Sequence, residues 1–475
     1  IFKSDANFSN AIFDMQIITI FREATFEGIA DFSNAKFNGS FIDFTGCTFN
    51  GRTFFNFCIF RGQTVFINAK FNGDLINFVG VQFLSSVNFN YAIFRGWTEF
   101  GDSKFNNYVF FESSIFEESV SFRGAKFSGE ANFKLAIFKK RANFQGSEFR
   151  SSVIFIATYF KDFVNFRETI FNNEVDFSNG TFEGFVDFEK SKFNANVNFS
   201  NTDFKKGTNV IKGKFKDLQA EAEACRIQRM CYEKEGRKDD ADKMFIREKR
   251  ALRRVRIREA YKQRAIVNVS ISVIKDLSIK DKFIKDRLKS LLRLVQAIMI
   301  SFMEWLIADL TCEYGTNWRR PIILWIIFVL GLFPFLYLVA GIESYKEGVV
   351  SIHTNEKQVK TILGLSILVV LVLIVYLYAK QDKHKRLSQI SSIVGIILAI
   401  ILFLLYHNAV STYNPYLILT SYLECLYFSI VTATTLGYGD LHPIGWARTI
   451  ASFEAIFGTI MWAIFLAVFS RKYMR

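Results

Sequence analysis

Hydrophobic residues in the first 200 positions recur with a period of eleven. Phenylalanines stand in pairs such as Phe89/Phe94 and Phe100/Phe105, five residues apart within a pair and six from one pair to the next. The series continues to Phe204, with slips of one or two residues in the first third. Asn, Gly, Ser, Thr and Asp surround the pairs, and these residues are poor helix formers. The pattern therefore predicts short strands stacked in a β-solenoid, and not the right-handed coiled coil that a period of eleven also permits.

The repeats resemble those of the pentapeptide-repeat family. The segments ANFSNAIF (6–13), ADFSNAKF (30–37) and ANFKLAIF (131–138) carry the resemblance. It implies a right-handed quadrilateral β-helix over residues 1–208, in which each Phe and the residue two before it face inward. The alternation of five and six departs from the family pattern and predicts coils of about 22 residues. Rows of aromatic rings also occur in base-stacking platforms, but core packing explains so strict a repeat better, so nucleic acid is an unlikely partner.

A basic helical linker is predicted over residues 209–290. Apolar residues at helical spacing indicate helices at Phe215–Glu235 and Asp239–Gln263. Residues 205–320 hold 29 Lys and Arg against 16 Asp and Glu. The basic run from Lys249 to Arg258 is interpreted either as a solvated face or as a surface for anionic lipid.

Residues 291–318 are predicted to form an amphipathic helix at the membrane surface. The segment is apolar but carries Glu304, whose charge would be costly at the centre of a bilayer. Trp305 and Trp318 suit anchors at the membrane interface. A fifth crossing here would also place the solenoid outside the cell, although residues 1–20 show no signal peptide.

Four apolar stretches are long enough to cross a bilayer. Three lie within residues 319–407, at about 321–342, 361–379 and 389–406, and the fourth is 450–469. Lys and Arg residues precede the first stretch and follow the second and the fourth. The positive-inside rule then puts both termini in the cytoplasm of a multi-pass plasma-membrane protein, which we expect to be prokaryotic.

The sequence Thr432-Ala-Thr-Thr-Leu-Gly-Tyr-Gly-Asp440 stands before the last apolar stretch. A dehydrating K⁺ needs rings of oxygen atoms in place of its water. Backbone carbonyls supply them when alternate residues adopt φ > 0, which glycine tolerates. Residues 417–470 resemble the potassium-channel pore. The resemblance implies a pore helix, a selectivity filter and an inner helix within residues 408–475, and a homotetramer around one axis.

The resemblance assigns roles to single residues. Oxygen atoms of Thr435, Leu436, Gly437 and Tyr438 would bind K⁺, with Gly439 completing the filter, while the Leu436 and Tyr438 side chains pack behind it. The residues expected to support the filter are Thr432, Thr434, Asp440, Tyr427, Phe428 and Glu424.

Other positions leave alternatives open. Ser421 and Glu424 have the spacing of a capping box that would start the pore helix. Gly458 is either a hinge or a packing glycine of the inner helix. His442 is either a pH sensor at the outer mouth or a solvated loop residue. Arg448 and Glu454 are candidates for an ion pair.

The sequence shows no voltage sensor, catalytic constellation or metal cluster, and its six cysteines are scattered. We therefore expect a non-enzyme without a cofactor, which conducts K⁺ passively as a homotetramer. The cytoplasmic array would regulate, scaffold or bind an unknown partner. The alternative is a membrane-tethered pentapeptide-repeat binding protein, a scaffold or a DNA mimic. Residues 1–204 hold 19 Lys and Arg against 22 Asp and Glu, which is too balanced for a DNA mimic.

Overall fold

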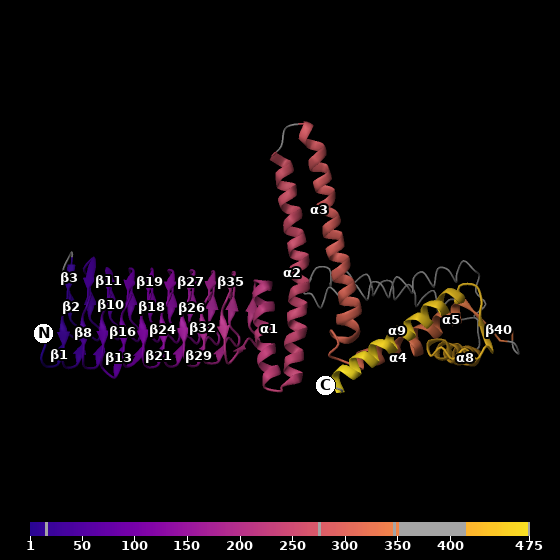
Figure 1. The fold of residues 1–475 in the computed structure, drawn as a ribbon, viewed down its shortest axis with the longest axis horizontal. Helices are drawn as coiled ribbons and strands as arrows, with labels where there is room; N and C mark the ends of the chain where they lie inside the picture. The colour runs from indigo at the N-terminus through magenta and orange to yellow at the C-terminus, as the bar shows by residue number, and fades with distance from the viewer. Residues whose placement is uncertain (15–17, 274–276, 345–347, 351–414, 474–475) are drawn as a thin grey trace. The chain divides into compact units, whose positions relative to one another are not determined.

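A computed structural model gives the fold of residues 1–14, 18–273, 277–344, 348–350 and 415–473 (Figure 1). The chain divides into two compact units, Ile1–Val255 and Arg256–Arg475. The predicted spans at 361–379 and 389–406 lie outside the described residues.

The N-terminal unit is a β-solenoid with four parallel sheets, as the repeat pattern predicts. The first sheet contains Ala6–Asn7 (β1), Ala30–Asp31 (β5), Thr53–Phe54 (β9), Leu75–Asn77 (β13), Trp97–Glu99 (β17), Val120–Ser121 (β21), Ala142–Asn143 (β25), Val164–Asn165 (β29), Val186–Asp187 (β33) and Thr208–Asn209 (β37). The second contains Ile12–Phe13 (β2), Lys36–Phe37 (β6), Ile59–Phe60 (β10), Gln82–Phe83 (β14), Lys104–Phe105 (β18), Lys126–Phe127 (β22), Glu148–Phe149 (β26), Ile170–Phe171 (β30), Lys192–Phe193 (β34) and Lys214–Phe215 (β38).

The other two sheets complete each coil. The third contains Ile18–Ile20 (β3), Phe41–Asp43 (β7), Gln63–Val65 (β11), Val87–Asn88 (β15), Val109–Phe110 (β19), Ala131–Asn132 (β23), Val153–Ile154 (β27), Val175–Asp176 (β31) and Val197–Asn198 (β35). The fourth contains Thr25–Phe26 (β4), Thr48–Phe49 (β8), Lys70–Phe71 (β12), Ile93–Phe94 (β16), Ile115–Phe116 (β20), Ile137–Phe138 (β24), Tyr159–Phe160 (β28), Thr181–Phe182 (β32) and Asp203–Phe204 (β36).

The register confirms the expected coil length. Ile93 pairs with Ile115, 22 residues later, whereas Ala6 pairs with Ala30 across a longer first coil. The solenoid continues to Phe215, so the predicted boundary at residue 208 is too early. The last coil has no distinctive sequence signal, because its inward residues are less regular than those before it.

Stacked phenylalanine rings fill the solenoid. Phe89 and Phe111, one coil apart, have ring centroids 4.9 Å apart and almost parallel planes, at 3°. Phe89 also meets Phe100 on the opposite side of the coil edge to face, at 5.7 Å and 76°. All three side chains are fully buried. Each ring thus packs along its row and across the core, and both geometries are favourable for aromatic pairs.

Removing one ring from this core should destabilise the solenoid. We expect Phe111→Ala to lower the free energy of unfolding by about 3–5 kcal/mol, because it leaves a cavity in a packed row. The adjacent Phe110 is only partly buried and points outward. Phe110→Ala is therefore the matched control, with a loss of less than about 1 kcal/mol. Urea unfolding of the full-length protein, followed by circular dichroism, measures both; equal losses would contradict this core.

Buried thiols lie in the same core as small apolar residues. Cys47 and Cys58 are fully buried, and burial raises the pKa of each thiol to about 12. A thiol with so high a pKa is almost never ionised and is chemically inert. None of the six cysteines forms a disulfide bond.

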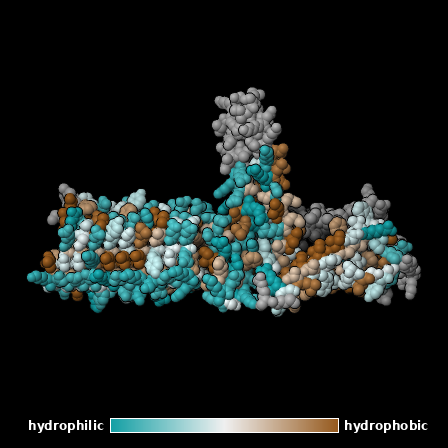
Figure 2. All heavy atoms as spheres, in the orientation of Figure 1, coloured by the Kyte–Doolittle hydropathy of each residue, from teal (hydrophilic) through white to brown (hydrophobic). Residues whose placement is uncertain are grey.

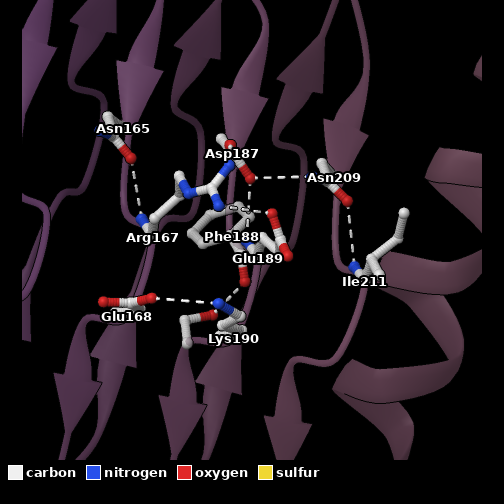
Figure 3. Close-up of polar contacts among 10 residues, drawn as sticks. Asn165, Arg167, Glu168, Asp187, Phe188, Glu189, Lys190, Asn209 and Ile211 are labelled. Atoms are coloured by element: carbon white, nitrogen blue, oxygen red, sulfur yellow. Dashed lines mark hydrogen bonds and ion pairs between the residues drawn. The ribbon is translucent and has the colours of Figure 1, made fainter.

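Charged side chains on the outer surface pair between neighbouring coils (Figure 3). Arg167 contacts Asp187 at 3.4 Å and Glu189 at 2.8 Å. Lys190 contacts Glu168 at 3.3 Å. The Lys190–Glu168 pair is exposed on both sides, and exposed pairs contribute little stability. In this region, acidic side chains therefore alternate with basic ones, unlike the unbroken negative charge of a DNA mimic.

Two helices close the C-terminal end of the solenoid. Helix α1 (Leu218–Lys234) inserts small residues into the core, and its Gln228 Oε1 accepts a hydrogen bond from Val210 N at 2.9 Å. On α2 (Lys238–Val273), Arg247 donates to Val210 O at 3.0 Å. The two predicted helices are thus present, and α2 extends ten residues beyond its expected end at residue 263.

Part of the basic run in α2 faces protein. Arg247 and Arg254 both pair with Glu221, at 2.8 Å and 3.2 Å, and Arg253 is fully buried. Arg253 and Arg254 of the run from Lys249 to Arg258 therefore belong to neither a solvated nor a lipid-facing surface. The expectation of a free basic face is wrong for these two, because a spacing of three or four residues cannot distinguish a face toward α1 from one toward solvent.

The second unit is mainly helical. Its elements are α3 (Leu277–Glu304), η1 (Trp305–Leu310), α4 (Arg319–Ile327), η2 (Phe328–Leu332), α5 (Phe333–Ala340), β39 (Ile342–Ser344), β40 (Gly348–Val350), α8 (Pro415–Ala433), β41 (Leu441–Pro443) and α9 (Ala447–Tyr473). By length and composition, Leu288–Leu310, Arg319–Leu338 and Ala447–Tyr473 could each cross a membrane. The surface over α4 and α9 is strongly hydrophobic in Figure 2. This indicates a membrane protein.

Candidate functional site

Helix α8, the candidate pore helix, ends directly before the filter sequence. Its last turn continues through a hydrogen bond from Leu436 N to Val431 O at 3.0 Å. The predicted start at the capping box of Ser421 and Glu424 is wrong, since both residues lie inside α8 (Pro415–Ala433). A proline is well suited to the first turn of a helix, because its missing N–H is not needed there.

The backbone of the candidate filter alternates in the sign of φ. Thr435, Gly437 and Gly439 have φ of 60°, 56° and 77°. Glycine adopts such values without strain, whereas Thr435 does so at a cost of about 1–2 kcal/mol. Alternation of this kind is what a line of carbonyls facing one side requires. Coordination of K⁺ by Thr435–Tyr438 remains a prediction.

The side chains of Leu436 and Tyr438 in the candidate filter are exposed to solvent in a single chain. Leu436 is 59% exposed and Tyr438 is 67% exposed. We expected these two side chains to pack behind the filter, and the described residues of a single chain provide no such packing. Large apolar side chains side by side on a surface indicate an interface.

Residues of α8 brace the segment that follows the filter. The Tyr427 hydroxyl is hydrogen-bonded to the Asp440 carboxylate. Phe428 instead turns away from the filter and meets the Tyr337 ring edge to face at 4.8 Å. Thr432 O accepts a hydrogen bond from Thr435 N at 3.1 Å. Tyr427 thus makes a polar contact beside the filter, whereas Phe428 has no polar group to make one.

Of the remaining support candidates, Thr434 directly follows α8 and Glu424 lies within it. The Thr434 hydroxyl donates to Ile430 O at 2.6 Å, which fixes the end of the helix. Glu424 lies in the helix interior beside the buried Cys425, well before the filter. Its proposed role at the filter is therefore untested.

Gly458 of α9 packs directly against the end of α8. A Cβ atom at this position would lie 2.3 Å from Ala433 O, closer than real contacts allow. Close approach thus explains why a glycine stands here. Bending of α9 at Gly458 remains a prediction.

Within one chain, Arg448 and Glu454 do not pair with each other. Arg448 donates to Pro443 O at 3.2 Å. Glu454 is fully buried and instead contacts the hydroxyl groups of Tyr337 and Ser429. Arg448 and Glu454 lie six residues apart on α9, so their side chains point to different sides of the helix.

A small sheet follows the filter. Strand β41 (Leu441–Pro443) pairs antiparallel with β39 (Ile342–Ser344), and His442 lies opposite Glu343. His442 therefore belongs to a strand and not to a free loop. Sequence reasoning missed this sheet because its strands have three residues each, too few for a period to be visible.

The segment between η1 and α4 contacts the C-terminal end of α9. Tyr314 O accepts a hydrogen bond from Arg471 Nη1 at 3.1 Å. The Trp318 ring meets Phe469 edge to face at 5.9 Å. Three successive residues, Glu313 to Gly315, have φ > 0 and form the tight turn that exposes this carbonyl. We call residues 311–318 the linker turn.

Comparisons with known proteins found similarities in both the N-terminal and the C-terminal part of the chain. A family model described as ion channel matches residues 390–475, and one for pentapeptide repeats (9 copies) matches 55–104 and 111–158. A curated relative, Potassium channel K2 of Plasmodium falciparum (isolate 3D7), is 37% identical over 60 residues, 11% of this chain and 4% of that protein. The chain thus spans only a small part of that relative. No solved structure matches. The chain carries pentapeptide repeats in its N-terminal part and an ion-channel domain at its C-terminal end.

Proposed function

We propose that the protein is a potassium-selective channel that conducts K⁺ passively as a homotetramer. The alternating φ values of residues 435–439, at the end of a helix and in an exposed segment, support this function most directly. Four copies would close each ring of carbonyl oxygens and would cover the exposed Leu436 and Tyr438. The name of the curated relative agrees with K⁺ as the permeant ion. No residue is assigned to catalysis.

The proposed setting is the plasma membrane of a prokaryote, with both termini in the cytoplasm and the solenoid there too. Residues 291–318 would lie at the membrane surface. Glu304 in this segment pairs with Arg256 at 2.7 Å and accepts a hydrogen bond from the Tyr314 hydroxyl at 3.1 Å. The charged Glu304 and Arg256 side chains would be costly at the centre of a bilayer but not among lipid headgroups and water. The membrane surface is therefore favoured for this segment.

Ion flux in proteoliposomes tests the proposed function. Full-length protein should dissipate a K⁺ gradient and leave an equal Na⁺ gradient almost intact, because the carbonyl rings replace the water of K⁺ better than that of Na⁺. Cross-linking should give a four-chain species in the same vesicles. Equal K⁺ and Na⁺ flux, or a monomeric protein, would refute the function.

The linker turn supports a regulatory role for the solenoid. The turn connects the linker helices, through η1, to the peripheral helix α4 and also touches Arg471 at the end of α9. Along the chain, the solenoid is joined to the peripheral helix α4 and not to the inner helix α9. This contact gives a route from the linker to the inner helix that the chain order conceals.

Removing residues 1–255 should change the open probability of the channel, and the linker turn should transmit the change. We expect the double variant Trp318→Ala/Arg471→Ala to show the altered open probability even with the solenoid present. Since a hydrogen bond to a charged group contributes about 1.5–3 kcal/mol, the shift should reach about tenfold. Single-channel recording measures it.

Combining the truncation of residues 1–255 with the double variant tests whether the linker turn transmits the effect of the solenoid on open probability. Truncation should add nothing further in the double variant, whereas Lys472→Ala, which removes a neighbouring charge, should leave the effect of truncation intact. A full effect of truncation in the double variant would show that the solenoid acts by another route.

The alternative function, a membrane-tethered binding protein whose conduction is secondary, has less support. The ion pairs in Figure 3 place basic side chains beside acidic ones, and the nearly balanced charge of residues 1–204 argues against a DNA mimic. A channel in which the solenoid binds a partner as a scaffold is compatible with both proposals.

A further inference from the structure

Glu454 is a buried acid at the junction of three elements. It lies on α9, and its side chain reaches Tyr337 on α5 and Ser429 on α8. Glu454 and Ser429 have no exposed surface. Among the described residues, neither Lys, Arg nor His neutralises the carboxyl group, whose contacts are the two hydroxyl groups. An unpaired charge at such a place is strongly unfavourable.

The number of available protons identifies the state of this acid. The Ser429 hydroxyl lies within hydrogen-bond distance of Glu454 Oε1 and, at 2.7 Å, of Val329 O. A serine hydroxyl has one proton to donate, and a carbonyl can only accept. Both contacts are satisfied only if Ser429 donates to Val329 O and Glu454 donates to Ser429. The Tyr337 hydroxyl then donates to the other oxygen of Glu454.

The last acceptor in this series of hydrogen bonds, Val329 O, lies in a π-helical turn. Val329 belongs to η2 (Phe328–Leu332), a π-helical turn. Two successive carbonyls of this turn accept hydrogen bonds from α8, since Leu330 O accepts from the Tyr422 hydroxyl at 2.8 Å. Turns of this type are rare and are often found at functional sites.

We propose that Glu454 bears a proton and, as a neutral carboxylic acid, is a positioning residue that holds the pore helix α8 between the outer and inner helices. The proposal rests on the proposed function, because α8 and the filter are parts of a pore only there. The contacts of Glu454 with Ser429 and of Gly458 with Ala433 lie one helical turn apart on both helices. Together they fix the end of α8 from which the filter extends.

Other titratable groups near this acid are few. Within the described part of the chain, α5 contributes Tyr337, α8 contributes the buried Cys425, and η2 contributes backbone carbonyls. Loss of the Glu454 proton would leave one of the two oxygen contacts of Ser429 without a hydrogen. The pore helix should then lose one attachment in each subunit, so K⁺ conduction should fall at alkaline pH.

Isosteric substitution tests the neutral acid. Glu454→Gln should retain K⁺ flux within about threefold of the unmodified protein, because the amide can donate to Ser429 and accept from Tyr337. Glu454→Ala should lose at least about tenfold, since the partners remain buried and unsatisfied. The fall in conduction at alkaline pH should be present in the unmodified full-length protein and absent in Glu454→Gln. Tyr337→Phe and Ser429→Ala should each weaken conduction in the direction of Glu454→Ala.

A second measurement does not depend on conduction. Infrared difference spectra of the tetramer should show the C=O band of a protonated carboxylic acid that disappears in Glu454→Gln. Absence of that band, or a Gln variant as damaged as the Ala variant, would overturn the proposal, because each would indicate an ionised carboxylate. If the unmodified protein does not select K⁺ over Na⁺, the proposed function fails, while the infrared band still decides the state of Glu454.

Discussion

Gly437→Ala should abolish selective K⁺ flux without disturbing the rest of the molecule. Gly437 has φ of 56°, and an alanine there is strained by about 1–2 kcal/mol in each subunit. Four copies add this strain at one ring of carbonyl oxygens. The expected result is a loss of more than tenfold in K⁺ flux in proteoliposomes, or loss of discrimination against Na⁺.

Gly445 provides the matched control. It also has φ > 0, at 48°, and a Cβ atom there would meet nothing within 4 Å, as at Gly437. Gly445→Ala therefore imposes a similar local strain outside the filter. Its K⁺ flux should remain within about threefold of the unmodified protein. If both variants lose flux equally, the effect reflects backbone strain in general and not the filter.

Gly458→Ala should disturb the filter through the pore helix. The added Cβ would lie 2.3 Å from Ala433 O, a backbone atom that cannot rotate away. Overpacking of this kind costs about 1–3 kcal/mol per site. We expect lower K⁺ selectivity and a less heat-stable tetramer, measured by flux and by the melting of the cross-linked species.

Gly331 in η2 is the control for helical glycine. A Cβ atom at Gly331 would meet nothing within 4 Å. Gly331→Ala should therefore be neutral or slightly stabilising, because alanine favours a helix by about 0.5–1 kcal/mol. A Gly458→Ala variant that changes only the rates of opening, with selectivity intact, would favour a hinge over the packing role.

Much of the fold follows from the sequence because the solenoid is locally repetitive. Inward residues return every coil, so Phe89 and Phe111 must stack if either faces the core. The C-terminal end of the solenoid was harder to predict from the sequence. Helix α1 takes the place of the next coil, and its small side chains and hydrogen bonds do not follow the repeat pattern. The basic residues Arg247 and Arg254 could not be placed, because their partner Glu221 lies on another helix.

The candidate site shows a similar division. The candidate filter motif is a continuous stretch of sequence, so it could be recognised directly. Gly458 was a candidate either for a hinge or for packing, and its contact with Ala433 on α8 could not be read from the sequence. The pairing of Glu454 with Tyr337 joins positions 117 residues apart, and the contact of Arg471 with Tyr314 joins positions 157 apart. Contacts of such separation depend on how helices pack, and one sequence gives no measure of that packing.

Anomalous scattering from Rb⁺, a close substitute for K⁺, tests the central proposal most directly. Crystals of the full-length protein in RbCl should show a row of peaks on a four-fold axis, between the oxygen atoms of Thr435 and Tyr438 from four chains. In NaCl with the filter intact, the row should be absent. Rb⁺ peaks away from these oxygens, or residues 435–439 from different chains that never approach a common axis, would contradict the account.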